Sequence, residues 1–213
     1  MRRFTLVDAI FLFGHDEFTG RAVLSRTSLG IGLAGAALCD LLFAERITVE
    51  DRKVRAIAGR PPGIPTADRV FSEIAAEPAS YRVRDWVDHL RGELPSRAAD
   101  DLVALGLVRR VPDRVLLRRK YRYPPADLFV STAARSKARA AVFDIDRPDP
   151  HAACLALLAW TAGVDDLHEP ELARADVRAW MAETHEALPR RIADVISGVA
   201  EVAAAVVYTG DRR

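Results

Sequence analysis

The sequence predicts a mainly α fold: a single globular helical domain around a central helix core, with a protruding basic β-hairpin. Three observations lead to this expectation. Apolar residues recur at helical spacing along most of the 213 residues. Half of the residues are hydrophobic, 29% are charged and the mean hydropathy is zero, as in ordinary globular proteins. Arginines gather in one strand-like stretch past the middle. We therefore expect residues 1–213 to form one domain.

The N-terminal third predicts two helices separated by a polar loop. Thr5 and Asp8 have the spacing of a capping box, which starts a helix over residues 6–13. Gly14 and Gly20 bracket a turn-rich loop over residues 14–21. From Ser28 onward, apolar residues recur every four positions up to residue 42, and three glycines permit close packing. We expect this helix to lie at the centre of the fold.

The middle of the chain predicts a short strand pair followed by three helices. Residues 46–57 alternate and favour two strands joined by a turn. A loop rich in proline and glycine follows at residues 59–65. Helices are expected over residues 66–76, 83–90 and 97–105, and Gly106 would close the last of them.

A basic hairpin is the next predicted element. Residues 107–119 have Pro112 and Asp113 between two short β-branched stretches. The segment from Arg109 to Arg139 holds ten basic and two acidic residues, a charge of +8, while the rest of the chain carries −7. Such asymmetry indicates an anionic partner. Further helices are expected over residues 128–142, 151–162, 170–185 and 189–208.

Composition argues against a membrane-spanning protein. Three apolar stretches, residues 29–44, 152–164 and 192–208, are too short or too charged to cross a bilayer, so we expect core helices. Cys39 and Cys154 lie in apolar runs and favour buried thiols in a reducing cytoplasm, and we expect no signal peptide. Trp86, Trp160 and Trp180 are expected in the core.

Two polar clusters could be mistaken for catalytic or metal sites. They are residues 15–17, His-Asp-Glu, and residues 165–169, Asp-Asp-Leu-His-Glu. Neighbouring residues seldom point the same way, so we expect the first cluster to lie in a loop and cap helices, and the second to start the helix after Pro170. The chain also has no nucleotide-phosphate loop, nucleophile elbow or paired zinc motif. We expect no enzyme, no cofactor and no metal.

Five segments, in this order and spacing, resemble the Golgi phosphoprotein 3 family, whose bacterial relatives are single domains. The segments are FTLVDAIFLFGHDEFTGR (4–21), LAGAALCDLLFAERI (33–47), DWV (85–87), DDLVALGLV (100–108) and RYP (122–124). The resemblance implies a helical domain with a protruding hairpin and peripheral membrane association. In eukaryotic members it also implies a shallow basic pocket for phosphatidylinositol 4-phosphate, with glycosyltransferase tails and coat proteins as partners. The family's pocket positions fall on Ser25, Ala34, Gly92 and Pro95.

The expected function is a non-enzymatic adaptor, peripherally associated with the cytoplasmic face of a membrane, that binds anionic phospholipid or phosphoinositide head groups. Head-group contacts are assigned to Arg91, Arg97 and Arg26. The hairpin would meet the membrane or mediate a homo-oligomer, through Arg109, Arg110, Arg114, Val115, Leu116, Leu117, Arg118 and Arg119. A protein client is also compatible with the family resemblance.

Two alternatives remain open. The arginines could form a solvated face, pairing with the protein's own carboxylates. Alternatively, the helix over residues 97–105, Gly106 and the hairpin imitate a winged helix-turn-helix, so the chain could be a nucleic-acid-binding regulator. Asp100 and Asp101 would repel the DNA backbone from that helix, which makes nucleic acid the less favoured partner.

Overall fold

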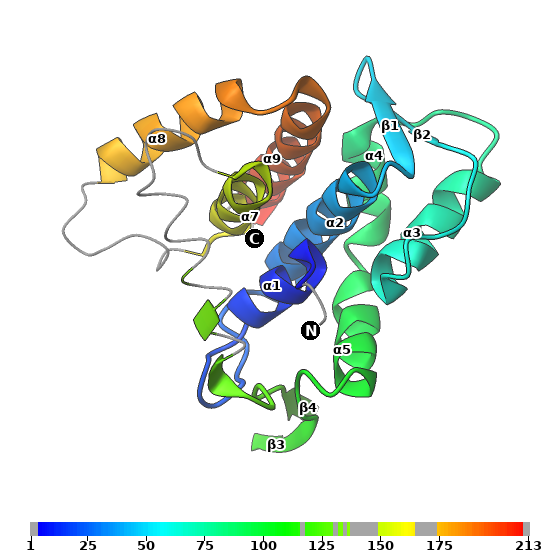
Figure 1. The fold of residues 1–213 in the computed structure, drawn as a ribbon. Coiled ribbons are helices and arrows are strands. Elements are labelled where there is room, and N and C mark those ends of the chain that lie inside the picture. Colours follow the sequence, from blue (N-terminus) through cyan, green and yellow to red (C-terminus); the bar gives the residue numbers. More distant parts are fainter. Residues whose placement is uncertain are drawn as a thin grey trace.

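The fold is mainly helical in the computed structural model, which describes residues 4–115, 118–129, 132, 133, 136, 149–164 and 174–210 (Figure 1). In chain order the first elements are α1 (Leu6–Phe13), α2 (Arg26–Phe43), β1 (Ile47–Glu50), β2 (Lys53–Ala56), α3 (Pro65–Ala76), α4 (Val83–Leu90) and α5 (Leu94–Ala104). They are followed by β3 (Val111–Val115), β4 (Arg118–Arg122), α7 (Pro150–Thr161), α8 (Arg174–Ala187) and α9 (Arg190–Gly210). The predicted fold class is confirmed.

Helix α2 is the centre of the fold, as predicted. It runs through the middle of the molecule and packs against α1, α3, α4, α5, α7 and α9 (Figure 1). Every residue from Leu29 to Leu41 is buried. A Cβ atom on Gly30 would lie 2.0 Å from the carbonyl oxygen of Arg91, so only glycine lets α2 approach the end of α4 this closely.

The start of α2 differs from the prediction. The helix begins at Arg26 rather than Ser28, because the Ser25 hydroxyl accepts a hydrogen bond from the backbone N–H of Ser28 and caps the first turn. Among the described residues, α2 is the one helix long and apolar enough to cross a membrane, but 72% of it is buried inside the fold. It is therefore a core helix, as the sequence predicts.

Helix α1 is fixed at its N-terminus by two carboxylates. The predicted capping box is confirmed: the Thr5 hydroxyl accepts from the N–H of Asp8 at 3.1 Å, and the Asp8 carboxylate accepts from the N–H of Thr5 at 3.2 Å. The Asp40 carboxylate on α2 accepts from the N–H groups of Leu6 and Val7 at 3.0 and 3.1 Å. A buried carboxylate of the central helix thus joins α1 to α2.

Helices α3 and α5 lie on one side of α2 and α7 lies on the other, while α4 packs against both α2 and α9 (Figure 1). Helix α5 begins three residues earlier than predicted, with Pro95 in its first turn, where a missing N–H costs no hydrogen bond. Gly106 follows α5 with a φ of 69°, in agreement with its predicted capping role. The helix predicted over residues 128–142 and the cluster over 165–169 lie largely or wholly outside the described residues.

The predicted basic hairpin is present, but its turn is elsewhere. Strands β3 and β4 are antiparallel, with Val111 opposite Arg122 and Val115 opposite Arg118. Pro112 and Asp113 therefore lie within β3 and do not form the turn, and residues 116 and 117 between the two strands lie outside the described residues. Both strands of a two-stranded ribbon are edge strands, and edge strands tolerate proline.

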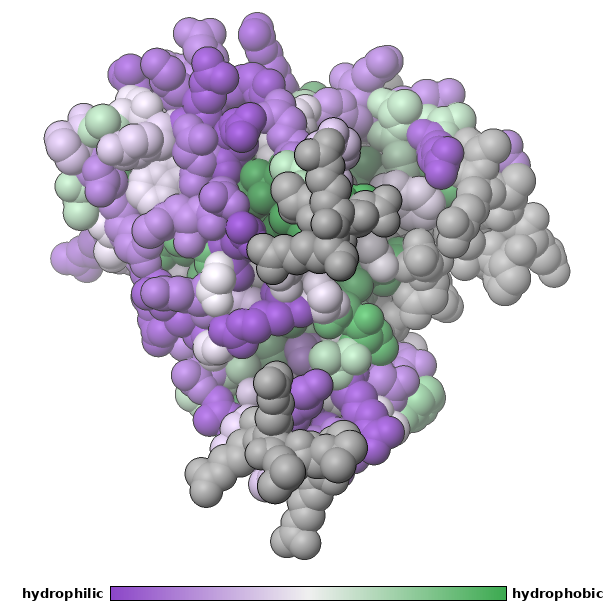
Figure 2. Space-filling model, turned by 180° about the vertical axis from the view of Figure 1, so that it is seen from behind, coloured by the Kyte–Doolittle hydropathy of each residue, from purple (hydrophilic) through white to green (hydrophobic). Residues whose placement is uncertain are grey.

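Viewed from behind, hydrophilic residues cover most of the surface, and hydrophobic ones show as smaller patches between them (Figure 2). The buried apolar residues form one continuous core that extends from α1 to α9. Both cysteines are buried free thiols, in agreement with the prediction. Trp86 is buried, and Trp160 and Trp180 pack against the core from partly buried positions.

Candidate anion-binding pocket

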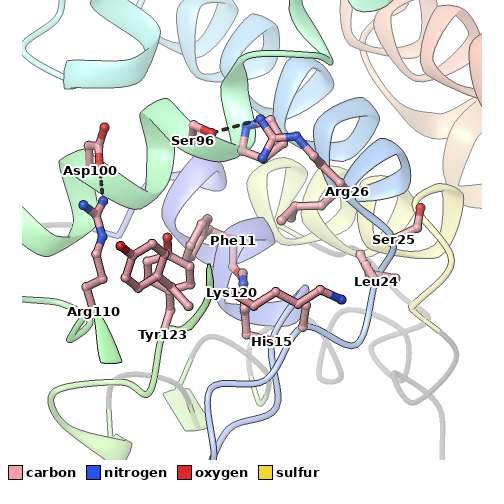
Figure 3. A pocket seen from close by; sticks show the side chains of 14 residues that line it. Phe11, His15, Leu24, Ser25, Arg26, Ser96, Asp100, Arg110, Lys120 and Tyr123 are labelled. Carbon is pink, nitrogen blue, oxygen red and sulfur yellow. Dashed lines mark hydrogen bonds and ion pairs between the residues drawn. The ribbon is translucent and has the colours of Figure 1, made fainter. Parts of the chain in front are cut away.

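A pocket of about 670 Å³ opens between the end of α1, the starts of α2 and α5, and the base of the β3–β4 hairpin (Figure 3). We call it the α2–α5 pocket. Its lining consists of Phe11, His15, Ala22, Leu24, Ser25, Arg26, Leu29, Pro95, Ser96, Asp100, Arg110, Lys120, Tyr121 and Tyr123. It therefore combines an aromatic wall with several charged side chains.

The aromatic wall is made by Phe11, His15 and Tyr123. The rings of Phe11 and His15 lie 4.4 Å apart, and Tyr123 meets both edge-on at 5.5 Å. His15 is buried, and its Nδ1 lies 2.7 Å from the carbonyl oxygen of Phe11, so Nδ1 carries the proton and donates. Burial lowers the pKa of His15 from its ordinary value, which keeps the ring neutral near pH 7.

The His-Asp-Glu cluster at residues 15–17 does not converge on one point. His15 is part of the aromatic wall, and its Nδ1 lies 2.7 Å from the Phe11 carbonyl oxygen. Asp16 instead accepts hydrogen bonds from the backbone N–H groups of Phe18 and Thr19 and organises a turn. Within the part of the chain that the structure describes, no three His, Cys, Asp or Glu side chains are grouped as a metal site would need. Asp16 therefore stabilises a turn of the predicted loop and does not cap a helix through these contacts.

Two cations of the pocket have no carboxylate partner among the described residues. The Arg26 guanidinium donates to the carbonyl oxygen of Gly92 at 3.1 Å and to the Ser96 hydroxyl at 2.9 Å, and both partners are neutral (Figure 3). Lys120 lies opposite Asp113 in the strand register, but its exposed side chain forms no hydrogen bond or ion pair with any described residue. Neither positive charge is therefore paired with a carboxylate within the described structure.

The Arg110 side chain lines the pocket and is held there by contacts with Asp100 and with two tyrosine rings. It pairs with Asp100, which raises the pKa of Arg110, and its guanidinium lies 5.5 Å from the centre of the Tyr121 ring and 6.0 Å from that of Tyr123. With three cations, one carboxylate and a neutral histidine, the pocket carries two net positive charges. Such a pocket favours anions.

The other arginines singled out in the sequence lie outside the pocket lining. Arg91 donates to Asp88 at 2.7 Å, and Arg97 lies between Glu73, at 2.6 Å, and Glu93. The Glu73 hydrogen bond raises the pKa of Arg97. Of the three arginines predicted to contact a head group, only Arg26 lines the pocket. For Arg91 and Arg97 the geometry matches the alternative of surface ion pairing.

The basic hairpin carries its charges next to the pocket. Arg109 is exposed and forms no side-chain hydrogen bond or ion pair with any described residue, and Arg122 lies 3.8 Å from Asp113. Strand register pairs Arg114 with Arg119. The side chains of Arg114, Val115, Arg118 and Arg119, and all of Leu116 and Leu117, lie outside the described structure. Their predicted membrane or oligomer role stays a prediction.

The winged-helix alternative gains no support from α5. The Asp101 carboxylate is buried and accepts hydrogen bonds from Thr66 at 2.7 Å and Arg69 at 3.0 Å, so it joins α5 to α3. Asp100 pairs with Arg110 at the pocket. The two carboxylates of the presumed recognition helix thus have structural partners, and nucleic-acid binding stays an untested prediction.

Sequence reasoning missed several pocket residues. Lys120 was counted in the basic segment but not singled out, and Tyr123 occurred only as part of the RYP segment. Of the family's pocket positions, Ser25 and Pro95 do line the pocket, and the carbonyl of Gly92 holds Arg26. Ala34, in contrast, is fully buried in α2. These aligned positions were the one signal that located the pocket.

Fold and pocket together define a class: mainly helical domains in which a shallow basic pocket adjoins a protruding basic hairpin. Residues 6–206 match the Golgi phosphoprotein 3 (GPP34) family, and the chain belongs to that family. The match covers nearly the whole chain, so the predicted resemblance is confirmed. No curated protein matches the chain.

Proposed function

We propose that this member of the family is a peripheral membrane protein, a non-enzymatic adaptor that binds anionic phospholipid or phosphoinositide head groups at the cytoplasmic face of a membrane. The observation that carries the proposal is the uncompensated charge of Arg26 and Lys120 in the α2–α5 pocket. Family membership supports the same function, because the match extends over the pocket and the hairpin.

A phosphate group suits this pocket in charge and in hydrogen bonding. A phosphomonoester carries about two negative charges near neutral pH, which would balance the two net positive charges of the pocket. The Arg26 guanidinium has five N–H donors, and its two hydrogen bonds to Gly92 and Ser96 involve only Nη2. The remaining donors can meet phosphate oxygens, while Phe11 and Tyr123 offer apolar contact to a ring-shaped head group.

The hairpin would add a less specific attraction. A basic side chain close to an anionic bilayer contributes about 1 kcal/mol, so a few engaged residues of the hairpin give measurable binding.

The test compares binding to vesicles of phosphatidylcholine alone with binding to vesicles that also contain phosphatidylserine or phosphatidylinositol 4-phosphate. We expect flotation only with the anionic vesicles, and at least about 30-fold weaker binding for the Arg26→Glu, Lys120→Glu double variant. The matched control is Lys53→Glu, Arg55→Glu on the β1–β2 hairpin, where Lys53 is exposed and Arg55 also donates to a serine hydroxyl.

Equal binding to neutral and anionic vesicles would overturn the proposal. An equal loss of binding in the pocket variant and the control variant would show that only total charge matters. The pocket would then have no part in the proposed function. As an adaptor, the protein would also bind a client protein and form a homo-oligomer through the hairpin. Sedimentation of the full chain, with and without anionic vesicles, measures that self-association.

A further inference from the structure

The loop between α1 and α2 presents an aromatic side chain that the pocket does not use. Phe18, in the segment GHDEFTGR, has 69% of its surface exposed, and nearby Val23 has 59% exposed. An aromatic side chain this exposed buries little of its apolar area within its own chain, so most of that area remains available to a partner.

The turn that carries Phe18 is rigid. The Asp16 carboxylate accepts hydrogen bonds from the N–H of Phe18 at 3.2 Å, and from the N–H and hydroxyl of Thr19, both at 2.7 Å. The backbone closes the same turn: Gly20 donates to the carbonyl of Asp16 at 2.9 Å, and Asp16 donates to that of Arg21 at 2.7 Å. Phe18 is thus held outward on a preorganised support.

The same loop is attached to the base of the basic hairpin. The N–H of Tyr123 donates to the carbonyl of Gly20 at 2.8 Å, and Arg21 lies 3.8 Å from Asp113 of β3. Gly20 has a φ of 67°, and a Cβ atom there would lie 2.0 Å from the nitrogen of Pro124, so only glycine allows this contact. The loop and the hairpin lie side by side at one end of the molecule (Figure 1).

The surroundings of Phe18 fit a membrane better than a protein surface. The exposed Arg21 belongs to the same turn, and the uncompensated Arg109 and Lys120 lie on the hairpin to which the turn is attached. Aromatic side chains flanked by arginine and lysine are typical of segments at the boundary between lipid head groups and acyl chains. The basic residues would meet lipid phosphates while the ring enters the layer below them.

We propose that Phe18 is a membrane anchor, which inserts into the head-group and acyl-chain boundary of an anionic bilayer beside the basic hairpin. The inference rests on the proposed function, because it needs the hairpin end of the molecule to face a membrane. It adds a hydrophobic contact from a segment outside both the pocket and the hairpin. Val23 would lie at the edge of the same contact.

The experiment places an environment-sensitive nitrobenzoxadiazole dye on the variant Phe18→Cys. Cys39 and Cys154 have none of their surface exposed, so the native thiols will not compete for the label. The control is Ile57→Cys, at an exposed apolar position beyond β2. With phosphatidylserine vesicles we expect a blue-shifted, brighter emission at position 18, quenched by lipids spin-labelled high on the acyl chain, and no change at position 57.

A second variant measures the contribution of the ring to affinity. Phe18→Ala keeps the hydrogen bonds of the turn, and we expect about tenfold weaker binding to anionic vesicles with an unchanged dependence on salt, because only an apolar contact is lost. Phe18→Leu should restore most of the binding. Lys120→Glu, in contrast, should reduce the salt dependence.

The outcomes separate this inference from the proposed function. If the labelled protein floats with anionic vesicles while the dye at position 18 keeps its aqueous emission, the anchor is disproved and the lipid-binding function stands. If the chain binds no vesicle of any composition, the proposed function fails and the anchor fails with it. An emission shift that depends on protein concentration without lipid would mean that a second copy covers Phe18, which also overturns the proposal.

Discussion

The two β-hairpins of the described structure lie at opposite ends of the molecule and differ in composition (Figure 1). The β1–β2 hairpin covers the core with Ile47, Val49 and Val54, which are all buried. The β3–β4 hairpin is dominated by charge, and β4 alone has the sequence RRKYR. Two hairpins of similar length thus differ in what their side chains offer: the first buries apolar residues in the core, and the second carries the charges of the proposed membrane contact.

Charge compensation separates the two ends further. On the β1–β2 hairpin, Arg52 pairs with Glu201. At the other end, Arg26, Arg109 and Lys120 have no carboxylate partner among the described residues. Positive charge that the protein does not neutralise itself is available to an external anion. The following predictions test this division.

The largest effect is expected when a charged residue replaces a buried one on the β1–β2 hairpin. Val54→Asp would bury a carboxylate without a partner and should lower the free energy of unfolding by about 3 kcal/mol or more. Lys120→Asp, on the exposed hairpin, should change that free energy by less than about 0.5 kcal/mol. Urea denaturation of both variants makes the comparison. Equal destabilisation by the two variants would contradict the division of roles.

A smaller effect is expected where the basic hairpin is attached to the body. Gly20→Ala introduces a Cβ atom at 2.0 Å from the nitrogen of Pro124, at a residue with a φ of 67°. We expect a loss of about 2 kcal/mol in the free energy of unfolding, measured by thermal denaturation. The control is Gly63→Ala, where the φ of 81° imposes similar backbone strain but no atom lies within 4 Å. If the two variants are equally stable, the close contact at Gly20 has no energetic importance.

The pair Arg91→Glu, Arg97→Glu distinguishes compensated from uncompensated arginines. Loss of the ion pairs to Asp88, Glu73 and Glu93 should cost about 1 kcal/mol of stability. We expect vesicle binding to change much less than in the Arg26→Glu, Lys120→Glu variant. The hypothesis that Arg91 and Arg97 contact head groups requires the opposite result, abolished flotation of the folded variant.

The sequence predicted the features that depend on near neighbours. The Thr5–Asp8 capping box, both hairpins and the Gly106 cap follow from residues a few positions apart, and all are present. The turn of the basic hairpin was misplaced, because a proline usually signals a turn and only the strand pairing reveals that Pro112 lies within an edge strand.

Features that depend on distant neighbours were missed. Asp40 caps a helix that begins 34 residues earlier in the sequence, and Glu73 engages Arg97 across 24 residues. Neither contact has a local signature, so the sequence did not show that Arg97 is engaged by Glu73. Arg26, predicted as a head-group contact, lines the pocket, whereas Lys120 was recognised only as part of a basic segment. Which arginines are free is therefore a property of tertiary packing.

The smallest effect concerns His15, the neutral member of the pocket wall. Because burial lowers its pKa below the ordinary value of 6.5, the folded protein takes up the His15 proton less readily than the unfolded chain does. The stability that depends on neutral His15 is therefore complete above pH 6.5 and is lost as the pH falls from there through the lowered pKa.

His15→Gln should remove this part of the pH dependence, because glutamine can donate to the Phe11 carbonyl but does not titrate. Urea denaturation of both proteins at pH 7.5 and 5.5 measures it, and the difference between wild type and variant should shrink at the lower pH. The protonated ring would add a third net positive charge to the pocket. Binding to anionic vesicles should therefore strengthen slightly in the wild type alone as the pH falls, and an identical response in the variant would exclude His15 as its source.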